Sequence, residues 1–285
     1  MKKLTLFLFF LLLGFALFSQ SLLWEITGKG LKSPSYLYGT IHIQDKRVFA
    51  YDKIVEDKIK ECKAYAMEIL MDDVQPEVAQ AAILMEDKTL DQILCKTDYA
   101  LLDSVFKVKT GMNILLYKKM KPFFIMSQLM QSEMSKDMEF ALDMHFLEIA
   151  KKNNKKTLGI EDFSDQIGAI DKLPLVVQAE MLMESIKNPS EENEKFDEML
   201  EAYMNAELKK LMELTNDTSM PDVFNQEFIV KRNIKMADNI AKFAKKQSVF
   251  NAIGAAHLYG NEGVIELLRK KGLEVKPIPF KFENN

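Results

Sequence analysis

Apolar runs of strand length lie near both ends of the chain, and helical periodicity fills most of the sequence between them. Residues 22–27 (LLWEIT) and 35–41 (SYLYGTI) are two such runs, and the link between them holds two glycines and a proline, which predicts a β-hairpin. Four further runs of the same character predict strands: 64–70, 157–160, 248–254 and 274–280. The two prolines in the last run favour the edge of a sheet.

Apolar residues recur at spacings of three and four over most of residues 76–151 and 164–213, as on one face of a helix. The same pattern predicts one long helix over residues 224–245 and a short one over 262–272. Neither terminal third could bury its strands alone, so we expect both to share one sheet. The prediction is an α/β (α+β) fold, a single mixed β-sheet domain built from the N- and C-terminal thirds with a large helical insertion.

The first twenty residues have the pattern of a secretory signal. Lys2 and Lys3 provide a basic start, and residues 6–18 form a run of 13 residues without a polar side chain, followed by Ser19. This run is shorter than the roughly 20 residues that a spanning helix requires. We therefore predict a signal peptide over residues 1–20, one domain over 21–285, and export to a periplasmic or extracellular location. The alternative is membrane anchoring by an uncleaved signal.

Composition narrows the class of partner. The chain is 48% hydrophobic, carries a formal net charge of −4 and has no basic block, so nucleic acid is not an expected partner. Cys62 and Cys95 are too few for a disulfide framework. We expect two buried free thiols, while an oxidising compartment leaves a disulfide between them as the alternative.

Two motifs of the pattern Gly-x-x-His follow predicted strands near the two ends of the chain. The first runs from Gly39 to His42 and the second from Gly254 to His257, and the chain holds only three histidines. Glycine lets the backbone turn tightly at the edge of a sheet, and imidazole is both a common metal ligand and a general base near neutral pH. One such histidine would be a structural residue by default, but the pair predicts a functional site.

Acidic residues accompany two other predicted strands. Glu68 lies near the end of the run 64–70, and Glu161 directly follows 157–160. A carboxylate beside a buried strand costs free energy unless it is paired, binds a metal or opens into a cleft. Glu68 is therefore a candidate metal ligand or general base, and an outward-pointing residue at the end of a strand is the alternative.

The long predicted helix before the second motif carries Arg232 and Asn233, which together could bind a carboxylate or an oxyanion. A solvated helix face is the default interpretation of this pair. His145 lies beside the apolar stripe of its own predicted helix, and we interpret it as a structural or surface residue rather than as a ligand.

Several familiar catalytic motifs are missing from the sequence. It contains no HExxH, no CxxC pair, no P-loop, no GxGxxG and no GxSxG. Conventional zincin, Walker-type, Rossmann and serine α/β-hydrolase mechanisms are therefore unsupported.

The order of these segments resembles the TraB/PrgY/GumN family. The similar stretches are LWEITGKGLKSPSYLYGTIH, AMEI, LDMHFLEIAKKNNKKTLGIEDFSDQ, KRNIKMADNIAKF and FNAIGAAHLYGNEGVIELLRKKGLEV, and they cover essentially residues 22–278. The two Gly-x-x-His motifs are the most specific mark of the resemblance.

The resemblance implies an α/β fold shared with the Tiki proteins and with erythromycin-esterase-like and ChaN-like proteins. It also implies metal-dependent proteolysis, with manganese or cobalt as the ion. Carried over by position, the implied site residues are His42, Glu68, Glu161 with Gln166 following it, Arg232 and His257. Ile160 departs from the family pattern, which more often has leucine there.

The leading hypothesis is an exported metal-dependent hydrolase that cleaves a peptide or protein substrate. His42 and His257 would hold a divalent Mn, Co or Zn ion, Glu68 would complete the coordination or activate a water, and Arg232 would stabilise the oxyanion. Glu161, Asn233, Gly39 and Gly254 would support this site. One alternative is a non-enzymatic protein that binds a peptide or haem at the same cleft. Another is a metal-free esterase with His42 and Glu68 as an acid–base pair.

Overall fold

A computed structural model describes residues 21–215, 222–279 and 281–283 of the chain. One mixed sheet of six strands has the order β4-β3-β5-β2-β1-β6. The strands are β1 (Leu23–Gly28), β2 (Ser35–Thr40), β3 (Ala64–Met67), β4 (Lys156–Gly159), β5 (Val249–Gly254) and β6 (Leu273–Pro277). Strands β4, β3, β5 and β2 are parallel, whereas β1 pairs antiparallel with both β2 and β6. The predicted fold class, the hairpin and the edge position of the last strand are confirmed.

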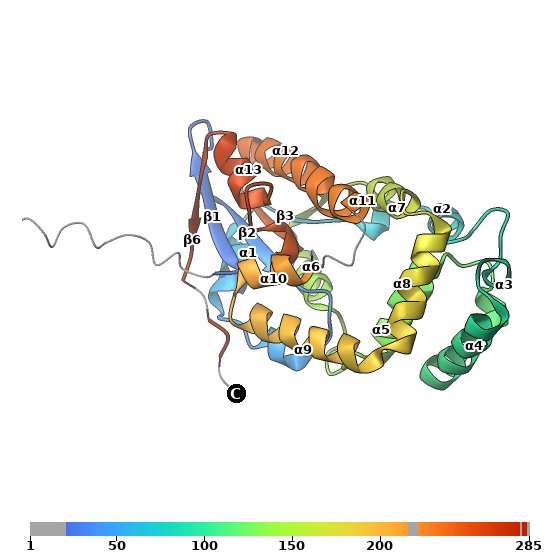
Figure 1. The fold of residues 1–285 in the computed structure, drawn as a ribbon. Coiled ribbons are helices and arrows are strands. Elements are labelled where there is room, and N and C mark those ends of the chain that lie inside the picture. The colour runs from blue at the N-terminus through green and yellow to red at the C-terminus, as the bar shows by residue number, and fades with distance from the viewer. Residues whose placement is uncertain (1–20, 216–221, 280, 284–285) are drawn as a thin grey trace, which may run out of the picture.

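The helices are distributed between the sheet and a cap. Their bounds are α1 (Ile54–Glu61), α2 (Pro76–Ala82), α3 (Leu90–Ile93), α4 (Lys96–Thr110), α5 (Pro122–Glu133), α6 (Leu142–Lys152), α7 (Phe163–Asp171), α8 (Leu175–Lys187), α9 (Pro189–Met204), α10 (Leu208–Thr215), α11 (Asp222–Phe224), α12 (Lys231–Lys246) and α13 (Val264–Lys270). Figure 1 shows α3, α4, α5 and α8 at the end of the molecule opposite to β1 and β6. Helix α9 runs from this cap back toward the sheet.

Two separate apolar clusters hold these parts together. In the sheet cluster the rings of Tyr38, Phe250 and Tyr65, from neighbouring strands, stack with centroids 6.3 and 6.2 Å apart, and Phe146 of α6 packs edge-on against Tyr38. Burying one such ring contributes about 1.5–3 kcal/mol. A second cluster joins the cap helices through Leu90, Leu102, Phe106, Ile125 and Leu182. The helical insertion therefore has an apolar core of its own.

The predicted long helix over 224–245 is interrupted. It begins as α11, widens into a π-helical segment over Asn225–Val230 and continues as α12. Such wide turns inside helices occur frequently at functional sites. Strand β3 is shorter than predicted and ends at Met67, so Glu68 is the first residue after it.

Both cysteines are free thiols, as predicted, but only Cys62 is buried. The expectation that Cys95 is buried was wrong, since Cys95 is exposed. It lies at the surface as the N-cap of α4, where its Sγ accepts a hydrogen bond from Asp98 N. The predicted signal peptide lies outside the described residues. Within the part of the chain that the structure describes, no helix is both long enough and apolar enough to cross a membrane.

Candidate active site

The two Gly-x-x-His motifs lie side by side at one end of the sheet. Strands β2 and β5 are parallel neighbours, and Thr40 is paired with Gly254 in their register. A Cβ atom at Gly39 would lie 3.1 Å from the Cα atom of Ala255, in the second motif, and 2.7 Å from Cδ1 of Leu258. The first motif therefore requires glycine because the backbone of the second passes directly over it. Both motif histidines line one cavity of about 580 Å³.

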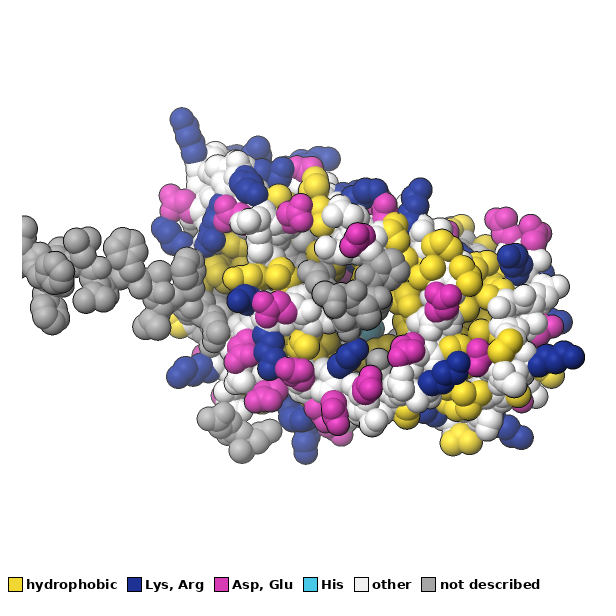
Figure 2. Space-filling view, in the orientation of Figure 1, with side chains coloured by type: hydrophobic (Ala, Val, Ile, Leu, Met, Phe, Trp, Pro, Cys, Tyr) yellow, Lys and Arg dark blue, Asp and Glu magenta, His cyan; other side chains and the backbone are white. Residues whose placement is uncertain are grey.

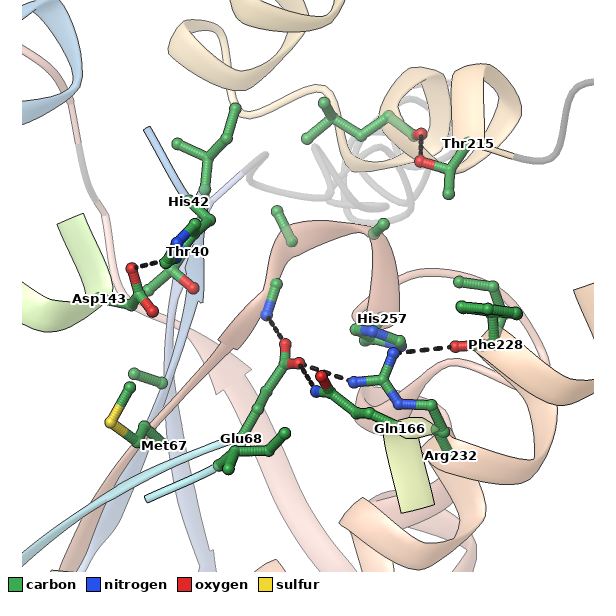
Figure 3. Close-up of a pocket in the computed structure, with 18 of the residues that line it drawn as sticks. Thr40, His42, Met67, Glu68, Asp143, Gln166, Thr215, Phe228, Arg232 and His257 are labelled. Carbon is green, nitrogen blue, oxygen red and sulfur yellow. Dashed lines mark hydrogen bonds and ion pairs between the residues drawn. The ribbon is translucent and has the colours of Figure 1, made fainter. Parts of the chain in front are cut away.

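His42 occupies the exposed side of this cavity. Its side chain is 66% exposed, and its Nδ1 lies 2.9 Å from Oδ1 of Asp143, at the start of α6. The hydrogen bond to Asp143 raises the pKa of His42, against the opposing effect of burial, and the charge of Glu68 acts in the same direction as Asp143. Figure 3 shows this pair on the opposite side of the cavity from His257.

His257 is buried in a short 3-10 turn that follows β5. Its Nδ1 lies 2.6 Å from Oδ1 of Asn233, while Nδ2 of Asn233 donates to the carbonyl of Glu262 at 2.8 Å. The amide of Asn233 thus presents its oxygen to the ring, so we assign the proton of His257 to Nδ1 and leave Nε2 with a lone pair. Burial, assisted by the charge of Arg232, lowers the pKa of His257 to about 4, although Glu68 opposes the shift. The ring is therefore neutral at pH 7.

Glu68 links the second motif to its surroundings. Its Oε1 accepts a hydrogen bond from Gly254 N at 2.6 Å, and its Oε2 accepts from Arg232 Nη2 at 2.7 Å and from Gln166 Nε2 at 3.1 Å. Burial alone would raise the pKa of Glu68, but His257, Arg232 and the N–H of Gly254 together lower it. Glu68 is therefore a carboxylate at neutral pH, with both oxygens engaged.

Arg232 is held between two carboxylates. Besides Glu68, it donates from Nε to both oxygens of Glu161 at 3.1 Å and from Nη2 to Oε2 at 2.8 Å, while Nη1 donates to the carbonyl of Phe228 in the π-helical segment. The side chain of Glu161 is fully buried, which raises its pKa despite Arg232, and the two carboxylates raise the pKa of Arg232 against burial. The guanidinium directs most of its donors at Glu68 and Glu161.

The sequence profile of the TraB/PrgY/gumN family matches residues 22–277. The chain belongs to this family. It is 22% identical to the Metalloprotease TIKI2 of Xenopus tropicalis over 91% of this chain and 60% of that protein, and 22% identical to the Metalloprotease TIKI1 of Danio rerio over 91% and 63%. It is also 22% identical to the uncharacterized protein YbaP of Shigella flexneri, over 82% of this chain and 88% of YbaP. The chain thus spans about 60% of the length of the Tiki proteins that it matches, and no solved structure matches it.

Membership of the TraB/PrgY/gumN family and the likeness to the Tiki proteins raise the question of whether the site fits a divalent ion. Both motif histidines engage Nδ1 with a side-chain oxygen, which is how proteins orient imidazole ligands whose Nε2 binds a metal. A third ligand is not assembled, because no group of three or more His, Cys, Asp or Glu side chains among the described residues is placed to hold an ion. The orientation of each imidazole therefore suits a metal ligand, and a shared ion with Glu68 as the third ligand stays a prediction.

Sequence reasoning missed Asp143. It lies 101 residues from His42, and only the packing of α6 brings the two together. Two contacts fix this helix start, since Leu142 N donates to the carbonyl of Ile43 at 3.2 Å and the hydroxyl of Tyr65 donates to the carbonyl of Asp143 at 3.0 Å. An aspartate in the first turn of a helix is so common that its sequence carries no signal of this role.

The third histidine lies outside the cavity. Nε2 of His145 is 3.1 Å from the hydroxyl of Tyr51, and its ring packs edge-on against Phe49 with centroids 5.2 Å apart. These contacts agree with its interpretation as a structural residue.

The cavity itself has mostly apolar walls, to which Met199, Leu211, Phe224 and Phe228 contribute. In Figure 2 a histidine is visible in the hollow between the sheet and the cap.

Proposed function

We propose that this chain is an exported metal-dependent hydrolase that cleaves peptides. The observation that carries the proposal is the pair of motif histidines on one cavity, each with Nδ1 engaged by a side-chain oxygen. The likeness to the Metalloprotease TIKI1 and TIKI2 proteins adds support for the reaction class. Export rests on the signal-like pattern of residues 1–20.

His42 and His257 would hold the ion through Nε2, with Glu68 as the third ligand, and the ion would be Mn²⁺, Co²⁺ or Zn²⁺. When bound, such an ion acts as a Lewis acid that lowers the pKa of water and polarises a carbonyl group. The local charge favours a cation, because Glu68, Asp143 and Arg232 line the cavity and the charge of Arg232 is also shared with the buried Glu161.

The other residues orient these groups and bind the substrate. Asn233 fixes the tautomer of His257, and Asp143 does the same for His42. Arg232 holds Glu68 beside His257. Its Nη1 donates one N–H to the carbonyl of Phe228 and has a second N–H to donate to a substrate oxygen. The apolar walls contributed by Phe224 and Phe228 suit the side chains of a peptide.

The His42–Asp143 hydrogen bond also supports a second candidate, a metal-free hydrolase. An aspartate that accepts from Nδ1 raises the basicity of the imidazole, as in catalytic triads, so His42 could act as a general base without an ion. In this case Asp143, rather than Glu68, is the partner of His42. The two candidates differ in one respect, since only the first loses its activity on chelation.

The test combines metal content with hydrolysis. The protein is stripped with chelator, loaded with Mn²⁺, Co²⁺ or Zn²⁺, desalted and assayed by elemental analysis, and its activity is followed on a fluorogenic peptide library. We expect about one ion per chain, lost in both His42→Ala and His257→Ala. His145→Ala is the matched control and should retain both the ion and the activity. A parent chain that binds no ion would overturn the proposal, and activity that survives exhaustive chelation would favour the metal-free candidate.

A further inference from the structure

One stretch of the cap contains basic residues but no acidic residue. Residues 104–132 contain no aspartate or glutamate, although the chain as a whole carries a formal net charge of −4. The stretch covers the C-terminal part of α4, the 3-10 turn Ile114–Tyr117 and most of α5. In Figure 1 these helices lie at the end of the molecule opposite to β1 and β6. The lysines of the stretch are Lys107, Lys109, Lys118, Lys119 and Lys121.

Three of these lysines have no acidic partner. Lys109 pairs with Glu133 and Lys121 with Asp171. Lys107, Lys118 and Lys119 are exposed and form no ion pair with any described residue. Their charges are therefore available to an external anionic group.

Large apolar side chains project from the same short segment. Val108 is 82% exposed, Leu115 60% and Leu116 80%. On the inner side of the segment Phe106 and Ile114 are fully buried, and the ring of Phe106 packs 5.3 Å from that of Tyr117. The cap core thus holds the segment through Phe106 and Ile114, while the three exposed apolar side chains alternate in sequence with exposed lysines. We call residues 107–119 the cap tip.

We propose that the cap tip docks onto the surface of an anionic lipid bilayer. Val108, Leu115 and Leu116 enter the boundary between headgroups and acyl chains, and Lys107, Lys118 and Lys119 contact the lipid phosphates. Apolar groups flanked by lysines are the pattern by which peripheral proteins bind anionic membranes. The aliphatic part of each lysine can lie in the apolar region while its ammonium group reaches the lipid phosphates. The high exposure of these apolar side chains favours insertion into lipid over the docking of a protein segment. The inference is independent of the proposed hydrolase activity.

A probe at the cap tip tests the insertion directly. The full-length chain carries an environment-sensitive fluorophore on Leu116→Cys, in a Cys95→Ser background so that the remaining thiol, Cys62, is buried. A matched chain carries it on Ile234→Cys, an exposed apolar position of α12. Each is mixed with vesicles of phosphatidylglycerol and phosphatidylcholine, or of phosphatidylcholine alone. We expect a blue shift only at position 116, only with the anionic vesicles, and less of it at high salt.

The lysines are tested with a charge-matched pair of variants. Lys118→Glu/Lys119→Glu should raise the lipid concentration needed for the half-maximal shift by at least about tenfold, since each lysine near an anionic surface contributes about fivefold. Lys245→Glu/Lys246→Glu makes the same charge change at two exposed positions at the end of α12 and should leave the response unchanged. An unshifted probe at position 116, equal shifts at positions 116 and 234, or an equal shift with phosphatidylcholine alone would overturn the proposal. A cap tip that binds a protein instead would give the first of these results.

Discussion

The two Gly-x-x-His motifs share one sequence pattern and two neighbouring strands, but their histidines lie in opposite environments. His42 is mostly exposed and bonded to a carboxylate, which raises its pKa, whereas His257 is buried and bonded to an amide, and its pKa is lowered to about 4. The motif fixes where each imidazole leaves the sheet. The helix that packs over each motif decides its chemistry, since α6 brings Asp143 to the first and α12 brings Asn233 to the second.

This asymmetry suggests a division of roles within the proposed site. A neutral imidazole with a fixed tautomer is suited to hold an ion at any pH near neutrality, because no proton competes for Nε2. His42 is accessible and more basic, which suits exchange of protons with a substrate as well as ligation. We therefore expect the first motif to be the side of the proposed site that faces the substrate.

The largest expected change in the free energy of unfolding comes from replacing Arg232, which supports the second motif. Replacing Arg232 with methionine leaves Glu161 buried without its partner and removes one donor from Glu68, so we expect Arg232→Met to lower the free energy of unfolding by about 3–5 kcal/mol. Lys235→Met, on the same helix, removes an ion pair with Asp162 and Asp165 near the surface and should cost less than about 1 kcal/mol. Urea unfolding of both variants measures the difference. Equal costs would show that the Arg232 pairs do not stabilise the fold.

The strand pattern of the fold could be predicted because alternation, glycine and proline are local signals. The hairpin of β1 and β2, the edge strand β6 and the strands that carry both motifs follow from them. Local signals do not report contacts between distant helices, so the Asp143 partner of His42 was not foreseen. The same holds for Glu68, whose sequence context indicates a buried carboxylate but not that Arg232, Gln166 and Gly254 would engage both oxygens. The helical spacing of apolar residues continues through Asn225–Val230, so the sequence gives no sign of the π-helical turn before Arg232.

A smaller effect is expected in the pH dependence of the free energy of unfolding, which should differ between the two histidines. In the metal-free protein the folded pKa of His257, about 4, lies below the unfolded value of about 6.5. The unfolded chain therefore binds this proton first as the pH falls, so the stabilisation is complete above about pH 6.5 and is lost progressively down to about pH 4. The loss is about 3 kcal/mol, as 1 pKa unit corresponds to about 1.4 kcal/mol. The free energy of unfolding of the parent, measured from pH 7.5 to 4, should fall by that much more than that of His257→Gln.

His42 should give the opposite sign in the same experiment. Because its folded pKa is raised, its contribution is present below the unfolded pKa and is lost as the pH rises through the folded pKa. His42→Gln should therefore remove a decline in stability above about pH 6.5 and leave the decline toward pH 4 intact. Parallel pH profiles for the two variants would contradict the division between an exposed, carboxylate-bonded imidazole and a buried, neutral one.

The smallest effect concerns the two glycines that begin the motifs. In Gly39→Ala the new methyl group would meet Leu258 Cδ1 at 2.7 Å and the backbone of Ala255 at 3.1 Å, and this backbone cannot move without displacing the turn that carries His257. We expect a loss of about 2 kcal/mol, in the range for an overpacked core. In Gly254→Ala the nearest atom is Oε1 of Glu68 at 3.2 Å, a side-chain atom that can shift by a few tenths of an ångström, so the cost should stay below about 1 kcal/mol. Thermal unfolding of the two alanine variants makes the comparison, and a larger cost at Gly254 would mean that the second motif, rather than the contact between the motifs, is the tighter part of the site.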